Sequence, residues 1–185
     1  DAGRQITTGV KNVIIGGLAG DALTTGSDNV AVGHQALNLN TSNDNTAFGN
    51  AALQRNSTGT QNAALGSYAL DDNTTGAANT AVGYNSMQAN TTGNDNTSVG
   101  QSSLRQNTTG IYNTAVGRSS QQNTTTGGSN TSVGRSSLNA CTTGSNNVSV
   151  GYANLSGLTT GSYNASIGQD TADVTTGGNN VLLGH

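Results

Sequence analysis

Asn79-Thr80-Ala81-Val82-Gly83 is one copy of a five-residue unit that recurs along the whole chain. The unit begins with Asn, usually continues with Thr or Val and then Ala or Ser, and ends with an apolar residue and Gly. Its first residue recurs, in steps of 17 residues except for two of 16, at Asn12, Asn29, Asn45, Asn62, Asn79, Asn96, Asn113, Asn130, Asn147, Asn164 and Asn180. A strict period with fixed apolar sites is typical of a solenoid, so we expect residues 1–185 to form a single repeat array.

The composition alone would favour disorder, because Thr, Gly, Asn and Ser make up 100 of the 185 residues and only 31% are hydrophobic. Low-complexity disorder would not keep one register through eleven copies. Helix-pair repeats need more than about 30 residues, and Asn, Thr and Gly are weak helix formers. We therefore predict an all-β fold, a parallel β-solenoid of about eleven 17-residue coils. Coils stacked about 4.8 Å apart would give a rod on the order of 50 Å long.

Strand alternation assigns the positions of the five-residue unit to two faces. The fourth position is apolar in every copy, so we predict that it points into the coil as a core ladder: Val32, Phe48, Leu65, Val82, Val99, Val116, Val133, Val150 and Ile167. The third position faces the other way and is small, which predicts close packing against another chain on an oligomer face: Ala31, Ala47, Ala81, Ser98, Ala115 and Ser132.

Three further positions recur with the same period. The Gly that ends each unit predicts a corner with a positive φ or a close chain approach, and the Gly of each Thr-Thr-Gly segment predicts a second corner. A second core contact is expected four residues after the first Gly, at Leu37, Leu53, Leu70, Met87, Leu104, Leu138 and Leu155. A partly buried ladder of stacked amides is expected at Asn40, Asn56, Asn73, Asn90 and Asn107, with Leu23, Thr124, Cys141 and Leu158 as replacements.

The core predicted in this way is thin. Two or three modest apolar side chains per coil bury little area, whereas ordering each residue costs about 1–2 kcal/mol of backbone entropy. A lateral partner would offset this deficit, so we expect a homo-oligomer, and a three-fold bundle suits a fibre.

The unit Asn79–Gly83, repeated at Asn113–Gly117, resembles the head repeats of trimeric autotransporter adhesins. The longer unit of residues 79–93 is similar to arrays in phage tail fibres and bacterial surface fibres. The resemblance covers residues 7–185. It implies a left-handed parallel β-roll, a homotrimeric fibre, and an extracellular place at a cell surface or on a virion. The 17-residue coil is longer than the usual adhesin unit.

The sequence offers little for catalysis, and we predict no enzyme, no catalytic residue, no metal site and no cofactor. His34 and His185 occupy the same repeat position at opposite ends of the array, where paired ligation is not expected. The only adjacent carboxylates, Asp71 and Asp72, are interpreted as a solvated turn. Cys141 replaces a ladder asparagine and is interpreted as a filler of the interior. A net charge of −3 without a basic cluster disfavours nucleic acid, and no apolar run approaches the ~20 residues of a membrane span.

The residue after each unit's Gly varies between copies, which predicts an exposed corner. Tyr84, Arg118, Arg135 and Tyr152 would form an outer stripe there over five successive coils. Tyr and Arg are favoured at recognition surfaces, so the stripe is a candidate site for a cell-surface glycan or protein receptor. The alternative interpretation is a solvated corner ridge.

We predict a structural fibre or adhesin module that associates with itself and presents surfaces for attachment to a cell or host. One alternative is an ice-binding solenoid that uses the threonine pairs at 24–25, 74–75, 91–92, 108–109, 142–143 and 159–160. Adjacent residues point to opposite sides of a strand, so only one rank of each pair would lie on a flat face. The other alternative is a carbohydrate-binding solenoid without catalysis.

Overall fold

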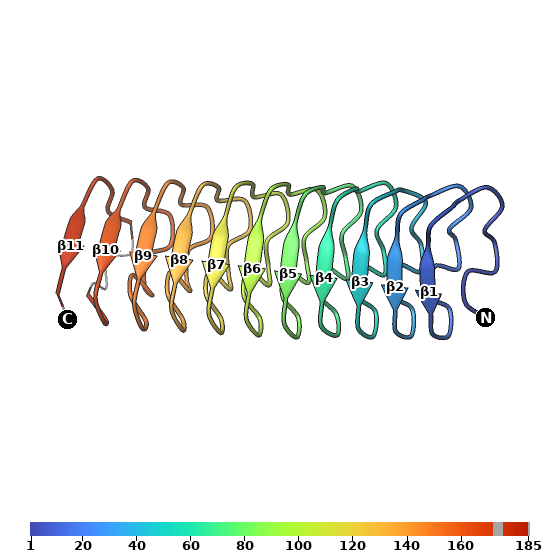
Figure 1. Ribbon diagram of the computed structural model, residues 1–185. Coiled ribbons are helices and arrows are strands. Elements are labelled where there is room, and N and C mark those ends of the chain that lie inside the picture. The colour runs from blue at the N-terminus through green and yellow to red at the C-terminus, as the bar shows by residue number, and fades with distance from the viewer. Residues whose placement is uncertain (172–175, 185) are drawn as a thin grey trace.

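The structure is a computed structural model that describes residues 1–171 and 176–184. Its described residues contain no helix and one parallel sheet of 11 strands, in which sequence order is also spatial order. The strands are β1 (Val13–Ile15), β2 (Val30–Val32), β3 (Thr46–Phe48), β4 (Ala63–Leu65), β5 (Thr80–Val82), β6 (Thr97–Val99), β7 (Thr114–Val116), β8 (Thr131–Val133), β9 (Val148–Val150), β10 (Ala165–Ile167) and β11 (Val181–Leu183). Figure 1 shows them side by side along a rod with the two termini at opposite ends. The predicted all-β parallel solenoid is confirmed.

Each strand pairs with the next in the register of the repeat. Thr80 lies opposite Thr97, Ala81 opposite Ser98, and Val82 opposite Val99. The two 16-residue steps keep this register, because Val30 still pairs with Thr46. Equivalent positions of successive coils therefore form continuous columns along the rod.

The corners that close each coil require unusual backbone conformations. Gly83 has a φ of 129°, and a Cβ there would lie 2.6 Å from the carbonyl oxygen of Gly100 in the next coil. This confirms the predicted corner with both a positive φ and a close chain approach. Leu53 has a φ of 50°, although the left-handed region costs a non-glycine residue roughly 1–2 kcal/mol. Its side chain is fully buried, so this conformation turns an apolar side chain into the coil.

The two faces of each strand are the reverse of the prediction. The third position is buried and the fourth is not: Ala47 is 0% accessible, whereas Phe48 is 53% and Leu65 50% accessible. The residues predicted as the core ladder lie half-buried or exposed on the outer face: Val32, Phe48, Leu65, Val82, Val99, Val116, Val133, Val150 and Ile167. The residues predicted as an outer oligomer face are buried inside the coils: Ala31, Ala47, Ala81, Ser98, Ala115 and Ser132.

The narrow interior explains this reversal. Ser86, three residues after Gly83, donates a hydrogen bond from its Oγ to the Oγ of Ser98 at 2.7 Å, so the two inner walls nearly touch. The remaining space holds the predicted second core contacts, and all seven of them are fully buried: Leu37, Leu53, Leu70, Met87, Leu104, Leu138 and Leu155. Larger third-position residues occur at the ends of the sheet, at Ile14 of β1 and Leu182 of β11, where both are only half-buried. Small residues at the third position thus fit the inside of one chain.

Two columns of asparagine run through the interior. In the first, Asn90 Nδ2 donates to Asn73 Oδ1 at 2.7 Å, and the same bond joins the whole predicted ladder from Asn40 to Asn107. The second column consists of the first residue of each unit, and its bonds were not predicted from the sequence. There the backbone N–H of every copy from Asn29 to Asn180 donates to the Oδ1 of the copy before it. These side chains satisfy backbone groups at the entry to each strand.

The first asparagine column ends at Asn107, because the next equivalent residue is Thr124. The Oδ1 of Asn107, the Oγ1 of Thr124 and the Oε1 of Gln121 are buried and have no hydrogen-bond partner among the described residues. The apolar core divides at the same place. One cluster of buried residues extends from Ala19 to Ala115, and a second contains Leu138, Cys141, Leu155 and Leu158. The coil that holds Gln121 and Thr124 is therefore a polar break in the core.

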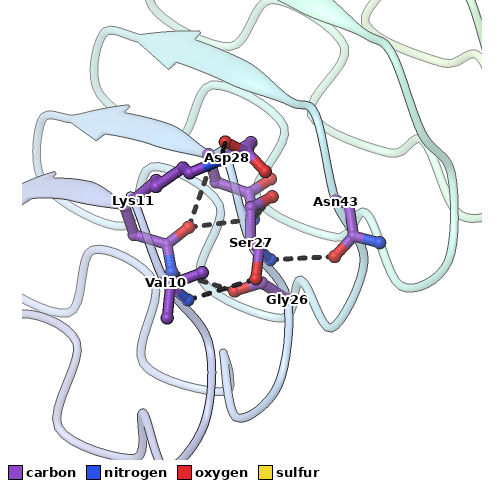
Figure 2. A network of polar contacts seen from close by, with 8 residues as sticks. Val10, Lys11, Gly26, Ser27, Asp28 and Asn43 are labelled. Carbon is purple, nitrogen blue, oxygen red and sulfur yellow. Dashed lines mark hydrogen bonds and ion pairs between the residues drawn. The ribbon is translucent and has the colours of Figure 1, made fainter.

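Side chains also bond to the backbone of the neighbouring coil at the corner before several strands, β1, β2, β5, β8 and β9. In Figure 2, the Oγ of Ser27 accepts a hydrogen bond from the Val10 N–H at 3.1 Å, and the Ser27 N–H donates to Asn43 Oδ1 at 2.8 Å. Asp28 lies beside them, with its carboxylate 3.7 Å from the Lys11 ammonium group. A polar residue in one coil thus satisfies a backbone group of the coil before it, which accounts for Ser and Asn at this turn.

Candidate functional site

Within 1–171 and 176–184 there is no group of three or more His, Cys, Asp or Glu side chains suited to a metal ion, and no pocket. Burial raises the pKa of the Cys141 thiol to about 11, so this side chain is a neutral thiol at pH 7. His34 is exposed, and His185 lies outside the described residues.

The Asp71-Asp72 turn differs from the predicted solvated turn. Asp71 is only 7% accessible, and its Oδ1 has no hydrogen-bond partner in the described part of the chain. Burial raises the pKa of Asp71, and the nearby Arg55 guanidinium partly opposes that effect. Asp72 forms an ion pair with the same arginine. The two neighbouring carboxylates thus occupy different environments and do not form a shared acid–base site.

The outer face of the sheet extends over all 11 strands. We call it the strand face and define it as the first and third residues of each strand from β1 to β11, which are the second and fourth residues of the five-residue unit. Its fourth-position column is apolar in all eleven coils, and its most accessible members are Ile15, Phe48, Leu65, Ile167 and Leu183 at 50–75%. Monomeric soluble proteins rarely leave so continuous an apolar surface in water. The strand face therefore has the character of an interaction surface.

The strand face carries no charged residue, and its second-position column mixes Thr, Val and Ala. Four consecutive strands, β5 to β8, have the same pair of outward residues, Thr and Val. Sequence reasoning missed this face because it placed the apolar column inside the coil. The signal that locates it is a small residue at both inner walls, as at Ala31 with Ala36 and Ala47 with Ala52, since two small positions mark a narrow interior.

The predicted outer stripe lies on an exposed corner directly after β5 to β9. We call it the corner ridge and define it by Tyr84, Gln101, Arg118, Arg135 and Tyr152, all of which are exposed. The Arg135 guanidinium lies 5.5 Å from the ring centroid of Tyr152, within range of a cation–π contact. Tyr84 meets the edge of a further ring, that of Tyr68, with centroids 6.1 Å apart. The contact with Tyr68 was not predicted, and Gln101, which occupies the same exposed repeat position, was not among the four residues predicted for the stripe.

The Thr-Thr-Gly turn exposes one threonine of each pair. The Oγ1 of Thr74 donates to the Thr91 carbonyl oxygen at 2.9 Å, and the first threonine of the following turns does the same. The second threonine is exposed in consecutive coils, at Thr58, Thr75, Thr92, Thr109, Thr126, Thr143 and Thr160. One rank of each pair thus faces solvent, and the pairs lie in bends outside the strands.

No helix in the described part of the chain is long and apolar enough to cross a membrane. No family model, curated protein or solved structure matches the chain.

Proposed function

We propose that this array is a structural fibre module that associates side by side with further copies of the same chain through its strand face. The observation that carries the proposal is the column of apolar side chains outside all eleven strands. Burial of apolar area contributes roughly 25 cal/mol per Å², so an interface along the whole rod would sum many small gains. This gain in free energy would offset the small amount of apolar area that each coil buries in its own interior.

Regular spacing favours a second copy as the partner. Every coil presents its fourth-position side chain about 4.8 Å from the next, so two copies in register meet at every coil at once. The lack of charge on the strand face removes the repulsion that identical charges would cause between identical faces. A three-fold arrangement suits this surface, because it turns three strand faces toward one axis and leaves the corner ridges outside.

In this proposal the fibre is extracellular, at a cell surface or on a virion, and the surfaces that remain outside attach to a receptor. The mechanical element is the continuous ladder of backbone and asparagine hydrogen bonds along the rod. This ladder supports the proposal because a pulling force along the rod would be shared by many parallel hydrogen bonds in each coil.

Light scattering of the purified chain tests the association. We expect a mass of three 18.4 kDa chains, and a Val99→Lys variant, which places a charge on the strand face, should shift the mass toward a single chain. Thr92→Lys is the matched control, because it adds the same charge at the exposed turn. A parent chain that stays at 18.4 kDa at every concentration would sink the proposal.

Ice binding remains a second candidate, and the repeated Thr and Val pair of β5 to β8 favours it. Thr80, Thr97, Thr114 and Thr131 form one rank, with Val82, Val99, Val116 and Val133 beside it on a regular sheet. Hydroxyl and methyl groups at constant spacing are suited to ordering water in a lattice. A thermal hysteresis assay decides: activity in the parent and its loss in Thr97→Lys would favour ice binding, and no ice shaping at millimolar protein would remove it.

A further inference from the structure

The corner ridge is held in register by the backbone. The carbonyl oxygen of Tyr84 accepts from the Ser102 N–H at 2.9 Å, and the carbonyl of Arg118 accepts from the Ser136 N–H at 2.9 Å. Equivalent bonds hold the carbonyls of Gln101, Arg135 and Tyr152. The five side chains therefore leave the rod one coil apart. Four coil spacings place the two tyrosines about 19 Å from each other, the length of a short oligosaccharide.

The charge around the ridge is distributed unevenly along the rod. Residues 1–95 contain three basic and seven acidic side chains, a net charge of −4. Residues 96–169 contain Arg105, Arg118 and Arg135 and no Asp or Glu, a net charge of +3. The overall value of −3 conceals this separation. Four of the five ridge residues, from Gln101 to Tyr152, thus lie in the basic part of an acidic protein, and Tyr84 lies before it.

The ridge arginines differ from the other cations in their partners. Arg4, Lys11 and Arg55 each pair with an aspartate of the next coil, at Asp21, Asp28 and Asp72. Arg105 donates to Gln88 Oε1 at 3.2 Å. Within residues 1–171 and 176–184, neither Arg118 nor Arg135 forms an ion pair. Two like charges in adjacent coils repel each other, and a bound anion would remove that repulsion.

The aromatic contacts orient the tyrosines at both ends of the ridge. Arg135 lies against the ring of Tyr152, and Tyr68 meets Tyr84 edge to face, so both rings are held while remaining about half accessible, at 46% and 51%. A held, half-exposed ring offers an apolar surface beside a hydroxyl group at low entropic cost. Sugar rings present a matching combination of C–H faces and hydroxyl groups.

We propose that the corner ridge binds an anionic polysaccharide. Arg118 and Arg135 bind carboxylate or sulfate groups through paired N–H donors, and Tyr84 and Tyr152 stack against sugar rings at either side. This inference goes beyond the proposed fibre, because the ridge follows the strands and is not part of the strand face. A polynucleotide fits less well, since nucleic-acid affinity depends on neutralising many phosphates and the ridge offers two unpaired cations.

Binding of immobilised polysaccharides by the full chain tests this inference. The probes are polygalacturonate for carboxylates, heparin for sulfates, neutral dextran, and single-stranded oligodeoxythymidine. We expect binding to at least one polyanion, weakening with added salt, and no binding to dextran. The Arg118→Gln/Arg135→Gln variant should bind at least about tenfold more weakly. Tyr84→Ser/Tyr152→Ser should also weaken binding, which a purely electrostatic contact would not show.

Arg4→Gln/Lys11→Gln is the matched control, because it removes the same charge from exposed pairs far from the ridge and should leave binding unchanged. The inference would be overturned if the control lost as much binding as Arg118→Gln/Arg135→Gln, or if the parent bound neither polyanion at low salt. It would also be overturned if the parent bound dextran equally well or bound the oligonucleotide more tightly. Light scattering on the same samples separates this result from the fibre proposal. A ridge variant that changes mass while the parent binds no polysaccharide would assign the ridge to assembly and overturn it as well.

Discussion

The side-chain Nδ2 of Asn96 donates to the Oδ1 of Asn79 at 3.1 Å and to the carbonyl oxygen of Gly110 at 2.8 Å. The Asn96 Oδ1 in turn accepts the N–H of Asn113 at 2.9 Å. One buried side chain thus contacts the copy of itself before it and the copy after it. The periodic asparagine is a structural requirement of the coil.

Asn96→Ala should destabilise the rod strongly. The substitution leaves the buried Asn113 N–H without a partner and removes one of the two donors to the Gly110 carbonyl oxygen, which keeps Asn107 Nδ2 at 3.1 Å. This predicts a loss of about 1–3 kcal/mol in the free energy of unfolding. Denaturant titration followed by circular dichroism measures this. Asn50→Ala is the control, because Asn50 is exposed and should change stability by less than about 0.5 kcal/mol. Similar losses in both variants would contradict the assigned role.

Gly83→Ala should be poorly tolerated for a different reason. The new Cβ would lie 2.6 Å from the Gly100 carbonyl oxygen at a φ of 129°, so both the clash and the strain must be relieved by moving a coil. We expect a cost of at least about 3 kcal/mol. Gly17→Ala offers a comparison, since the nearest atom there is His34 Cδ2 at 3.5 Å. If thermal melting gives both variants the same midpoint, stacking of the corner glycines is wrong.

Thr124→Asn should stabilise the rod by restoring the interrupted ladder. The new amide would donate to the unpartnered Oδ1 of Asn107, a gain of about 1 kcal/mol. Urea unfolding provides the measurement. Thr126→Asn, on the exposed side of the same turn, should stay within about 0.5 kcal/mol of the parent. A destabilised Thr124→Asn variant would show that this position does not continue the asparagine column.

Asp71→Asn should stabilise the chain at neutral pH and lose its effect in acid. Burial raises the pKa of Asp71 in the folded state, so the folded chain holds that proton more tightly than the unfolded chain does. Stability is then greatest below the unfolded pKa and falls as pH rises through the folded pKa. The variant should be more stable than the parent at pH 7 and equal to it near pH 3.

Asp72→Asn is the control for this pH dependence. It removes the carboxylate that pairs with Arg55, so it should lower stability at pH 7 by about 1 kcal/mol or less. Unfolding curves for the parent and both variants across this pH range make the comparison. A gain from Asp71→Asn that persists unchanged at low pH would argue against a buried charged carboxylate.

The period, the strands and the leucine column were predictable because each depends on residue types that recur at fixed spacing. The asparagine column from Asn40 to Asn107 was predictable for the same reason, since stacked amides satisfy one another. Which face of each strand points into the coil was not predictable. Alternation separates Ala81 from Thr80 and Val82, but it does not say which face is inside. Hydrophobicity favoured the larger Val82, whereas the space between Ser86 and Ser98 admits only small residues.

The corner ridge was predictable as an exposed stripe because its residues vary between copies. The partners of its members were not predictable from spacing alone. The contact of Tyr68 with Tyr84 depends on where the chain turns after Gly66, and the left-handed conformation of Tyr68, with a φ of 59°, sets that direction. Repeat position therefore locates a residue along the rod, while the corner geometry decides what it touches.

Small-angle X-ray scattering of the 185-residue chain in solution tests lateral association through the strand face. We expect the mass of three 18.4 kDa chains together with the length of one rod, on the order of 50 Å, because the copies lie side by side. A particle with the mass of a single chain would contradict it. So would a heavier particle whose length grows in proportion to its mass, since that would place the contacts at the ends of the rod.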